Sequence, residues 1–128
     1  MIFVDTNVVM YAVGREHPLR ESAQRFFEEH FESKHRLTSS AEVLQELMHA
    51  YISVERIETL DRALTLMEST VHEIWPIEEE DVRFARALIQ RYPELGARDL
   101  LHLACCRRRN VTKLKTYDRA LAAAFERE

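Results

Sequence analysis

The stretch Ile2-Phe3-Val4-Asp5-Thr6-Asn7 predicts how the chain begins to fold. Its first three residues are apolar and either β-branched or aromatic, which favours a short buried strand. Asp5, Thr6 and Asn7 are residue types that suit the end of a strand and the start of a helix. Because sites in α/β proteins form at the carboxyl ends of strands, Asp5 is a candidate functional carboxylate.

Strand and helix patterns alternate along the rest of the sequence. The expected strands cover residues 2–4, 36–38, 71–75 and 111–115. The expected helices cover residues 18–31, 40–54, 57–67, 78–92, 99–107 and 117–125, with Ser39 or Ser40 capping the second of them. Parallel strands need crossover connections, and helices are the usual ones. The alternation therefore predicts an α/β fold with a mainly parallel central sheet of four to five strands flanked by helices.

Length and composition are those of one globular domain over residues 1–128, since 46% of the residues are hydrophobic and 31% are charged. The longest apolar run, Val8–Val13, is far shorter than the roughly 20 residues that span a bilayer. We expect no leader segment before Asp5 and no membrane association. The adjacent Cys105 and Cys106 suit apolar positions of a helix rather than a disulfide, so we expect a cytoplasmic protein.

The net charge of −4 means that the molecule as a whole does not attract a polyanion, so any nucleic-acid contact must be local. Two groups of basic residues are candidates for such a contact. A solvated surface is the alternative explanation for both groups. The groups are Arg107, Arg108, Arg109, Lys113, Lys115 and Arg119, and Arg15, Arg20 and Arg36.

Four of the 22 acidic residues stand out by position: Asp5, Glu46, Asp99 and Asp118. Asp5 and Asp118 follow expected strands, and Asp99 starts an expected helix. Glu46 lies about 40° from Ala50 on a helical wheel, at the rim of the apolar face rather than opposite it. Taken singly, each acid is also explained as a helix cap or a surface residue.

Gathered in one site, these carboxylates would repel one another by several kcal/mol per close pair, at an order-of-magnitude estimate. A divalent cation removes the repulsion. Oxygen ligands suit Mg²⁺, with Mn²⁺ as a substitute, and Mg²⁺ also accepts phosphate oxygens of a substrate. The four acids therefore indicate metal-dependent cleavage of phosphate esters.

Four segments of the chain resemble the motifs of PIN domains, especially the VapC-like toxins of bacterial and archaeal toxin–antitoxin pairs. Their acids follow the order of the family at intervals of 41, 53 and 19 residues. The resemblance covers the whole chain, and the combination of the motifs is more specific than any one of them. The segments are Phe3-Val4-Asp5-Thr6-Asn7-Val8, Ser39-Ser40-Ala41-Glu42-Val43-Leu44-Gln45-Glu46-Leu47, Asp99-Leu100-Leu101-His102-Leu103-Ala104 and Thr116-Tyr117-Asp118.

The resemblance implies an Mg²⁺-dependent endoribonuclease that hydrolyses single-stranded or looped RNA, as the toxin of a toxin–antitoxin pair. It implies that the four acids coordinate one or two Mg²⁺ ions, while Asn7 and Thr116 support them through hydrogen bonds. A homodimer and a cognate antitoxin that occludes the acidic site are implied as well. The candidate RNA contacts among the basic residues are then Arg15, Arg107, Arg109, Lys115 and Arg119.

Three features limit what is carried over from the family. The last expected strand has Lys113 and Lys115 where relatives usually have aliphatic residues, which favours a strand at the edge of the sheet. Glu42 stands one helical turn before Glu46 as a rival acid, but it lies about 100° from Val43 and is expected to be more exposed. His102 shares a helix face with Asp99, and we expect it to make one structural hydrogen bond rather than to bind metal.

Two other functions fit parts of the sequence. Asp5 after a hydrophobic strand resembles the nucleophile of haloacid-dehalogenase-like phosphatases, but Asn7 stands where that family has a second Asp. A non-catalytic PIN-like module that binds a partner protein is the other alternative, and it is disfavoured because all four acids are present. A PIN-domain nuclease that processes RNA without an antitoxin also has the same motifs.

Overall fold

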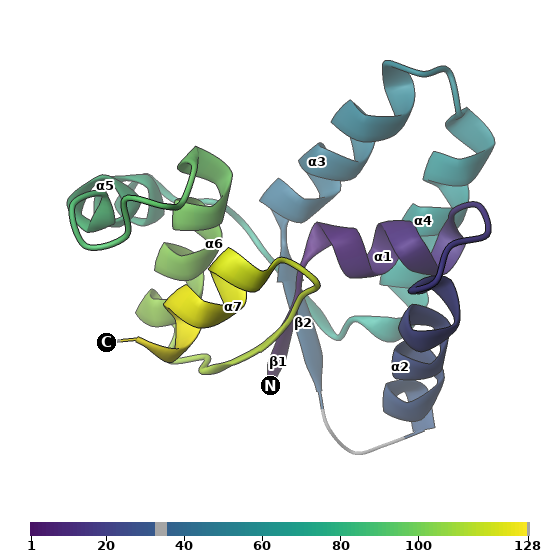
Figure 1. Cartoon of the computed structure of the whole chain (residues 1–128), viewed down its shortest axis with the longest axis horizontal. Coiled ribbons are helices and arrows are strands. Elements are labelled where there is room, and N and C mark those ends of the chain that lie inside the picture. Colours follow the sequence, from purple (N-terminus) through teal and green to yellow (C-terminus); the bar gives the residue numbers. More distant parts are fainter. Residues whose placement is uncertain (33–35, 128) are drawn as a thin grey trace.

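The computed structural model describes residues 1–32 and 36–127, and within these residues four short strands form one sheet (Figure 1). The order across the sheet is β3-β2-β1-β4, and all neighbouring strands are parallel. The predicted α/β fold with a parallel sheet is therefore confirmed, and the lysine-containing strand β4 lies at an edge. The strands are β1 (Ile2–Val4), β2 (Leu37–Ser40), β3 (Glu73–Trp75) and β4 (Lys113–Lys115).

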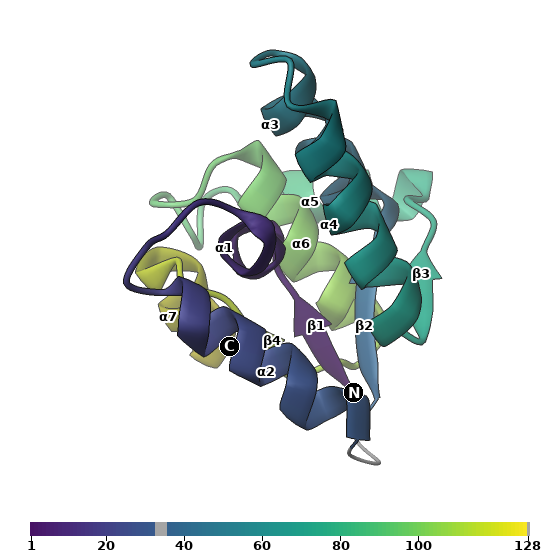
Figure 2. The same cartoon turned by 90° about the vertical axis from the view of Figure 1, so that its right-hand side faces the viewer.

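Helices cover both faces of the sheet, as Figure 1 and Figure 2 show. Helices α1, α2 and α4 lie on one side, α5, α6 and α7 on the other, and α3 rises from the end of β2. Among the described residues, no helix combines the length and the apolar character needed to cross a bilayer. The helices are α1 (Thr6–Val13), α2 (Arg20–Glu32), α3 (Ala41–Ile52), α4 (Ile57–Thr70), α5 (Glu79–Leu88), α6 (Ala97–Arg108) and α7 (Arg119–Glu126).

The strand register brings distant parts of the sequence to one edge of the sheet. Val4 is paired with Lys115, and the backbone amide of Asp5 donates to the carbonyl of Lys115 at 3.0 Å. Strand β2 is parallel to β1 and ends at Ser40, whose side chain caps α3 by accepting from the amide of Val43. The carboxyl ends of β1, β2 and β4 therefore open on the same side, where the predicted site is expected.

Strand β2 is longer than its sequence suggests, because polar residues continue it. Thr38, Ser39 and Ser40 are all completely buried. The hydroxyl of Thr38 donates to the carbonyl of Glu73 at 2.9 Å, and that of Ser39 donates to the carbonyl of Val4 at 3.1 Å. These hydrogen bonds satisfy hydroxyl groups that would otherwise be costly to bury, so the strand extends beyond the predicted end at Thr38.

Several helix boundaries differ from the prediction, and α1 is not among the expected helices. Helix α5 ends at Leu88 rather than near Tyr92, although the amide of Tyr92 still donates to the carbonyl of Leu88 at 3.1 Å, and Pro93 prevents helical backbone beyond this turn. Helix α6 begins at Ala97 with Gly96 as its N-cap, so Asp99 is the third residue of the helix and not the first. Asp99 is thereby free of the capping role that the sequence offered as an explanation.

The apolar stripe predicted for residues 43–54 is only partly buried. Val43 and Leu47 are inaccessible to solvent, whereas Met48 is 46% and Val54 is 59% exposed. The C-terminal end of α3 and the N-terminal end of α4 extend beyond the body of the molecule in Figure 1. The prediction of one continuous buried stripe was therefore wrong at this end of α3. The two cysteines lie buried in α6 as free thiols, as expected for apolar positions.

Candidate metal-binding active site

Asp5 lies at the centre of the candidate site, between β1 and α1. Its side chain is buried and is the N-cap of α1, with Oδ1 accepting from the amide of Thr6 at 2.8 Å. Oδ2 accepts from the hydroxyl of Thr116 at 2.7 Å and from the side-chain amide of Asn7 at 3.3 Å. Burial raises the pKa of Asp5, while His102 and the Thr116 hydrogen bond oppose the rise.

Asn7 and Thr116 tie the last motif to the first. Besides its bond to Asp5, the side-chain amide of Asn7 donates to the hydroxyl of Thr116 at 3.2 Å. Its Oδ1 accepts from the backbone amide of Tyr117 at 3.1 Å. The hydroxyl of Thr116 also accepts from the amide of Asp118 at 3.0 Å. Both residues thus make the kind of supporting hydrogen bonds expected of them, and they hold the loop after β4 beside Asp5.

Glu46 reaches the same cluster from the second turn of α3. Its Oε2 accepts from the hydroxyl of Thr6 at 2.7 Å, and its Oε1 lies 2.7 Å from Nε2 of His102. Glu42, one turn earlier, instead faces Arg98, with 4.0 Å between Oε1 and Nε. The structure therefore brings Glu46, and not the rival Glu42, into contact with neighbours of Asp5.

His102 contacts both Glu46 and Asp5, and the sequence did not predict these contacts. The ring is 1% exposed, and Nε2 lies 3.6 Å from Oδ1 of Asp5 in addition to its contact with Glu46. Burial alone lowers the pKa of His102, but the hydrogen bond with Glu46 and the charge of Asp5 outweigh burial and raise it. Its Nδ1 has no hydrogen-bond partner among the described residues. The imidazole makes one hydrogen bond, as expected, and makes it to a candidate ligand.

Asp99 and Asp118 complete the predicted set from α6 and from the start of α7. Asp99 is half-buried, and burial together with the negative charges of Asp5 and Asp118 raises its pKa to about 6. Asp118 is the N-cap of α7, with Oδ1 accepting from the amide of Leu121 at 3.0 Å. The charges of Asp5, Asp118 and Glu46 all act on Asp99, so the four predicted acids share one electrostatic environment.

This donor set suits a hard divalent cation. Ligand atoms of Asp5, Glu46 and His102 all lie within 4.8 Å of one another. Carboxylate oxygens favour Mg²⁺ or Mn²⁺. An imidazole nitrogen in the same cluster suits Mn²⁺ better than Mg²⁺. Burial, and after it the charges of Asp5 and Asp118, raises the pKa of Asp99, and a bound cation would offset this repulsion between carboxylates.

The predicted basic residues differ in whether their charged groups already contact other parts of the chain. The guanidinium group of Arg107 donates to the carbonyls of Ala124 and Arg127, and that of Arg109 donates to Asp81 at 2.7 Å. Arg15 and Arg119 are exposed. The ammonium group of Lys115 lies over the rings of Phe26 and Tyr117, at 5.4 and 4.9 Å from their centroids.

The PIN domain family model matches residues 2–126, which is nearly the whole chain. This chain belongs to the PIN domain family. It is 61% identical to Ribonuclease VapC23 of Mycobacterium tuberculosis over 98% of both chains, and 42% identical to Ribonuclease VapC13 of the same species over 93% of this chain and 91% of the relative. It is therefore a VapC-like PIN domain. The four acids lie within the matched residues, in the cluster described above.

Solved structures agree with the fold. The crystal structure of Mycobacterium tuberculosis VapC20, described as a sarcin-ricin loop cleaving toxin, superposes with a TM-score of 0.81 at 19% identity and covers 97% of this chain and 95% of that one. FitAcB from Neisseria gonorrhoeae superposes with a TM-score of 0.66 at 21% identity, over 98% and 94% of the two chains. At these identities the likeness establishes the PIN fold alone.

Proposed function

We propose that this PIN domain is a metal-dependent endoribonuclease that hydrolyses RNA phosphodiester bonds. The proposal rests on two observations at the carboxyl ends of the strands: ligand atoms of Asp5, Glu46 and His102 lie within 4.8 Å of one another, and burial together with the charges of Asp5 and Asp118 raises the pKa of Asp99 to about 6. The relatives named ribonucleases support the substrate class, since they match nearly the full length of the chain. We expect Mg²⁺ as the cofactor, with Mn²⁺ as a substitute.

In this proposal Asp5, Glu46, Asp99 and Asp118 hold the cation and are the catalytic residues. A bound divalent cation supplies a polarised water and charge stabilisation for phosphodiester hydrolysis. Asn7 and Thr116 keep the Asp5 carboxylate in one orientation through hydrogen bonds of 3.3 and 2.7 Å. The charges of the other three acids all act on Asp99, so we expect its loss to be the most damaging.

The direct test is incubation of a mixed RNA pool with the purified protein in Mg²⁺, in Mn²⁺ and in EDTA. We expect cleavage with either metal, none in EDTA, and none with Asp99→Asn. Glu46→Gln and Glu42→Gln form a matched pair, of which the first alone is expected to lose activity. Absence of metal-dependent cleavage by the wild type would favour the non-catalytic module, and phosphate trapped on Asp5 would favour the phosphatase.

Among the candidate basic residues, we place the RNA contacts first on Lys115, Arg119 and Arg15. Lys115 ends the strand beside Asp5, Arg119 follows Asp118 directly, and Arg15 lies exposed in the loop after α1. Arg107 and Arg109 rank behind these three, because their guanidinium groups already bond to other parts of the chain. Removal of a phosphate contact is expected to weaken binding to all RNA sequences alike and to lower its dependence on salt.

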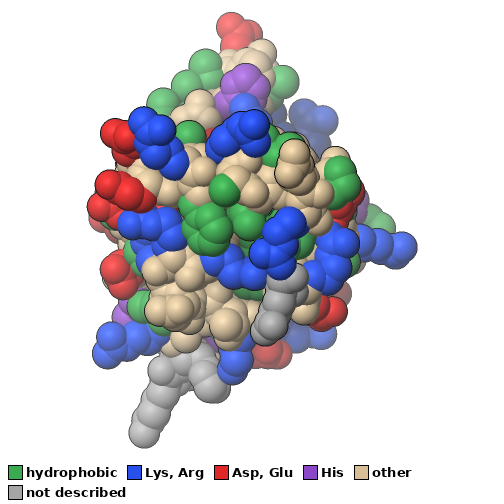
Figure 3. Space-filling model, turned by 90° about the vertical axis from the view of Figure 1, so that its left-hand side faces the viewer, with side chains coloured by type: hydrophobic (Ala, Val, Ile, Leu, Met, Phe, Trp, Pro, Cys, Tyr) green, Lys and Arg blue, Asp and Glu red, His purple; other side chains and the backbone are tan. Residues whose placement is uncertain are grey.

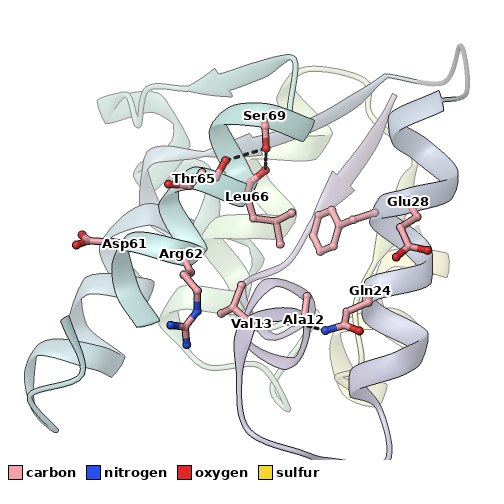
Figure 4. A pocket seen from close by; sticks show the side chains of 10 residues that line it. Ala12, Val13, Gln24, Glu28, Asp61, Arg62, Thr65, Leu66 and Ser69 are labelled. Atoms are coloured by element: carbon pink, nitrogen blue, oxygen red, sulfur yellow. Dashed lines mark hydrogen bonds between the residues drawn. The ribbon is translucent and has the colours of Figure 1, made fainter. Parts of the chain in front are cut away.

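The proposed partner is the antitoxin of a toxin–antitoxin pair, docked in the groove between α2 and α4. The groove has a volume of about 560 Å³, and Figure 4 shows Val13 and Leu66 facing it from opposite sides. Phe27 also lines the groove, and its charged lining residues are Glu28, Asp61 and Arg62. An apolar antitoxin segment fits this surface, and basic residues at its edges would face the two acids. Leu66→Glu is expected to abolish complex formation in copurification with the antitoxin, and unchanged copurification would exclude the groove.

We further propose a cytoplasmic homodimer formed through α5. Val82 is 53% and Ile89 43% exposed, two turns apart on the same side of the helix, beside a hollow of about 260 Å³ lined in part by Leu100 and Leu101. Figure 3, which faces this side of the molecule, shows hydrophobic side chains surrounded by Lys and Arg. Ile89→Glu is expected to give a monomer in sedimentation equilibrium, whereas a dimeric Ile89→Glu variant would exclude this face.

A further inference from the structure

A cluster of aromatic side chains lies next to the acidic site and is not used by it. Tyr11, four residues after Asn7 on α1, meets Tyr117 edge-on, with ring centroids 5.5 Å apart and an interplanar angle of 77°. Tyr117 immediately precedes Asp118, and its backbone amide is bonded to Asn7. Four residues of helix span about 6 Å, so the ring of Tyr11 starts only one turn from the acidic cluster.

His17 is the outermost ring of this cluster and is held in place from two sides. Its imidazole lies against the ring of Tyr11, with centroids 4.5 Å apart and an interplanar angle of 30°. Its Nδ1 accepts a hydrogen bond from the backbone amide of Leu19 at 3.1 Å. The residue is nevertheless exposed. A surface side chain gives up rotamer freedom to be fixed in this way, and here the result is a flat ring with one face on Tyr11 and the other open.

Positive charge accompanies the rings. Arg15, two residues before His17, is exposed, and the ammonium group of Lys115 lies 4.9 Å from the centroid of the Tyr117 ring. The hydroxyls of Tyr117 and Ser22 lie 2.9 Å apart in a hydrogen bond that fixes Tyr117 against α2. Rings for stacking together with cations for phosphates are the combination that binds single-stranded nucleic acid, in a molecule whose overall charge is negative.

We propose that the exposed face of His17 stacks on an unpaired nucleobase of the RNA, close to the phosphate that is cut. This inference rests on the proposed function for its substrate class. Tyr11 backs the imidazole, and Arg15 and Lys115 contact the flanking phosphates. Stacking tolerates every base, so the platform positions the strand and does not read its sequence. His17 is thus a substrate-binding residue that acts on KM, separate from the acids that act on kcat.

The first arm of the test measures cleavage of a short single-stranded RNA whose cut position has been mapped, with an abasic nucleotide placed at each neighbouring position in turn. For the wild type we expect one abasic position to raise KM about tenfold. His17→Ala is expected to raise KM by the same factor on intact RNA, with kcat unchanged and no further rise at that abasic position. His17→Phe keeps a flat ring and is expected to restore the wild-type KM.

His72→Ala is the matched control, since His72 is also exposed but precedes β3 at the opposite end of the sheet. A KM for His17→Ala equal to that of the wild type overturns the proposal, as does a failure of His17→Phe to restore it. The second arm needs no cleavage and measures how far the protein quenches the fluorescence of a 2-aminopurine-labelled RNA strand in EDTA. Quenching by the wild type and by His17→Phe but not by His17→Ala supports stacking, and equal quenching by all three excludes it, even where the wild type fails to cut RNA.

Discussion

Two buried acidic clusters in this protein are built in opposite ways. The first is centred on Asp81, whose side chain is completely buried between α5 and the end of α6. It accepts from the guanidinium groups of Arg108 and Arg109 at 2.6 and 2.7 Å, and from the backbone amide of Glu78 at 2.8 Å. Burial alone raises the pKa of Asp81, but these bonds outweigh burial and hold the pKa well below its usual range.

The second cluster surrounds Asp5, which is 5% exposed. Its hydrogen-bond donors Thr6, Asn7 and Thr116 are uncharged, and the imidazole of His102 lies 3.6 Å away. The neighbouring carboxylates add negative charge, which acts after burial to raise the pKa of Asp99 to about 6. Asp81 is thus neutralised by two arginines within the chain, whereas several carboxylates around Asp5 share the single imidazole of His102, so we expect a cation from outside to balance the remaining charge.

The largest predicted effect on stability is at Asp81. Asp81→Ala leaves two arginines without their buried partner and one helix cap without its acceptor, so we expect the free energy of unfolding to fall by about 3 kcal/mol. Urea unfolding at pH 7 in EDTA measures this. Glu79→Ala, which removes only the exposed ion pair with Arg83, is the control and is expected to cost less than about 1 kcal/mol. A similar fall in the free energy of unfolding for the two variants would contradict the structural role of Asp81.

The next effect distinguishes the two glutamates of α3. Glu46→Gln removes a charge from the cluster that contains Asp5, so we expect the affinity for Mn²⁺ to fall by at least about tenfold in calorimetric titration. Glu42→Gln changes a side chain of the same type one turn away that faces Arg98, and its affinity is expected to stay at the wild-type value. A loss of affinity for Mn²⁺ in Glu42→Gln alone would show that Glu42, and not Glu46, belongs to the metal site.

A smaller effect, opposite in sign to that at Asp81, is expected at Asp99. Without metal, Asp99→Asn relieves repulsion from Asp5 and Asp118, so the free energy of unfolding at pH 7 should rise by about 1 kcal/mol. This change is well below what the pKa shift alone suggests, because Asp99 is only partly buried and solvent screens its charge. Urea unfolding in EDTA measures it, and a destabilised Asp99→Asn would mean that Asp99 has a structural partner like that of Asp81.

The two clusters should also respond to pH in different ranges. A carboxyl group whose pKa is raised contributes stability that is present below 3.8 and is lost as the pH rises through about 6, as for Asp99. The lowered pKa of Asp81 gives the reverse, a contribution present above 3.8 and lost as the pH falls further. We therefore expect the advantage of Asp99→Asn over wild type to shrink between pH 7 and pH 5. An advantage that does not change over this range would contradict the raised pKa.

Much of the fold could be predicted because its signals are local, whereas the joint role of the four acids stays a prediction. Alternating strand and helix patterns gave the parallel sheet, and the rule that sites lie at strand ends selected Asp5 and Asp118. The contacts of His102 with Glu46 and Asp5 depend on how α6 packs against α3 and β1, which no spacing along the chain expresses. Thr6, which links Asp5 to Glu46, carries no signal beyond its place in the first motif.

The run Arg107–Arg109 shows the same limit for charged residues. From the sequence it is a basic patch, and two of its members were predicted RNA contacts. In the structure Arg108 and Arg109 bond to Asp81, more than twenty residues earlier, and Arg107 bonds to the end of α7. A run of charges along the chain does not reveal its partners, because these are set by tertiary packing. The same holds for Met48 and Val54, whose exposure follows from how far α3 extends.

The most direct test of the contrast between the two clusters is the melting temperature of the protein as Mg²⁺ or Mn²⁺ is added at pH 7.5. A cation that binds the folded state alone stabilises it in proportion to the logarithm of its concentration above the dissociation constant. We expect a melting temperature that rises with metal for the wild type and stays constant for Asp99→Asn, in which the repulsion between carboxylates has already been relieved. A wild-type melting temperature that is the same in metal and in EDTA would contradict this expectation.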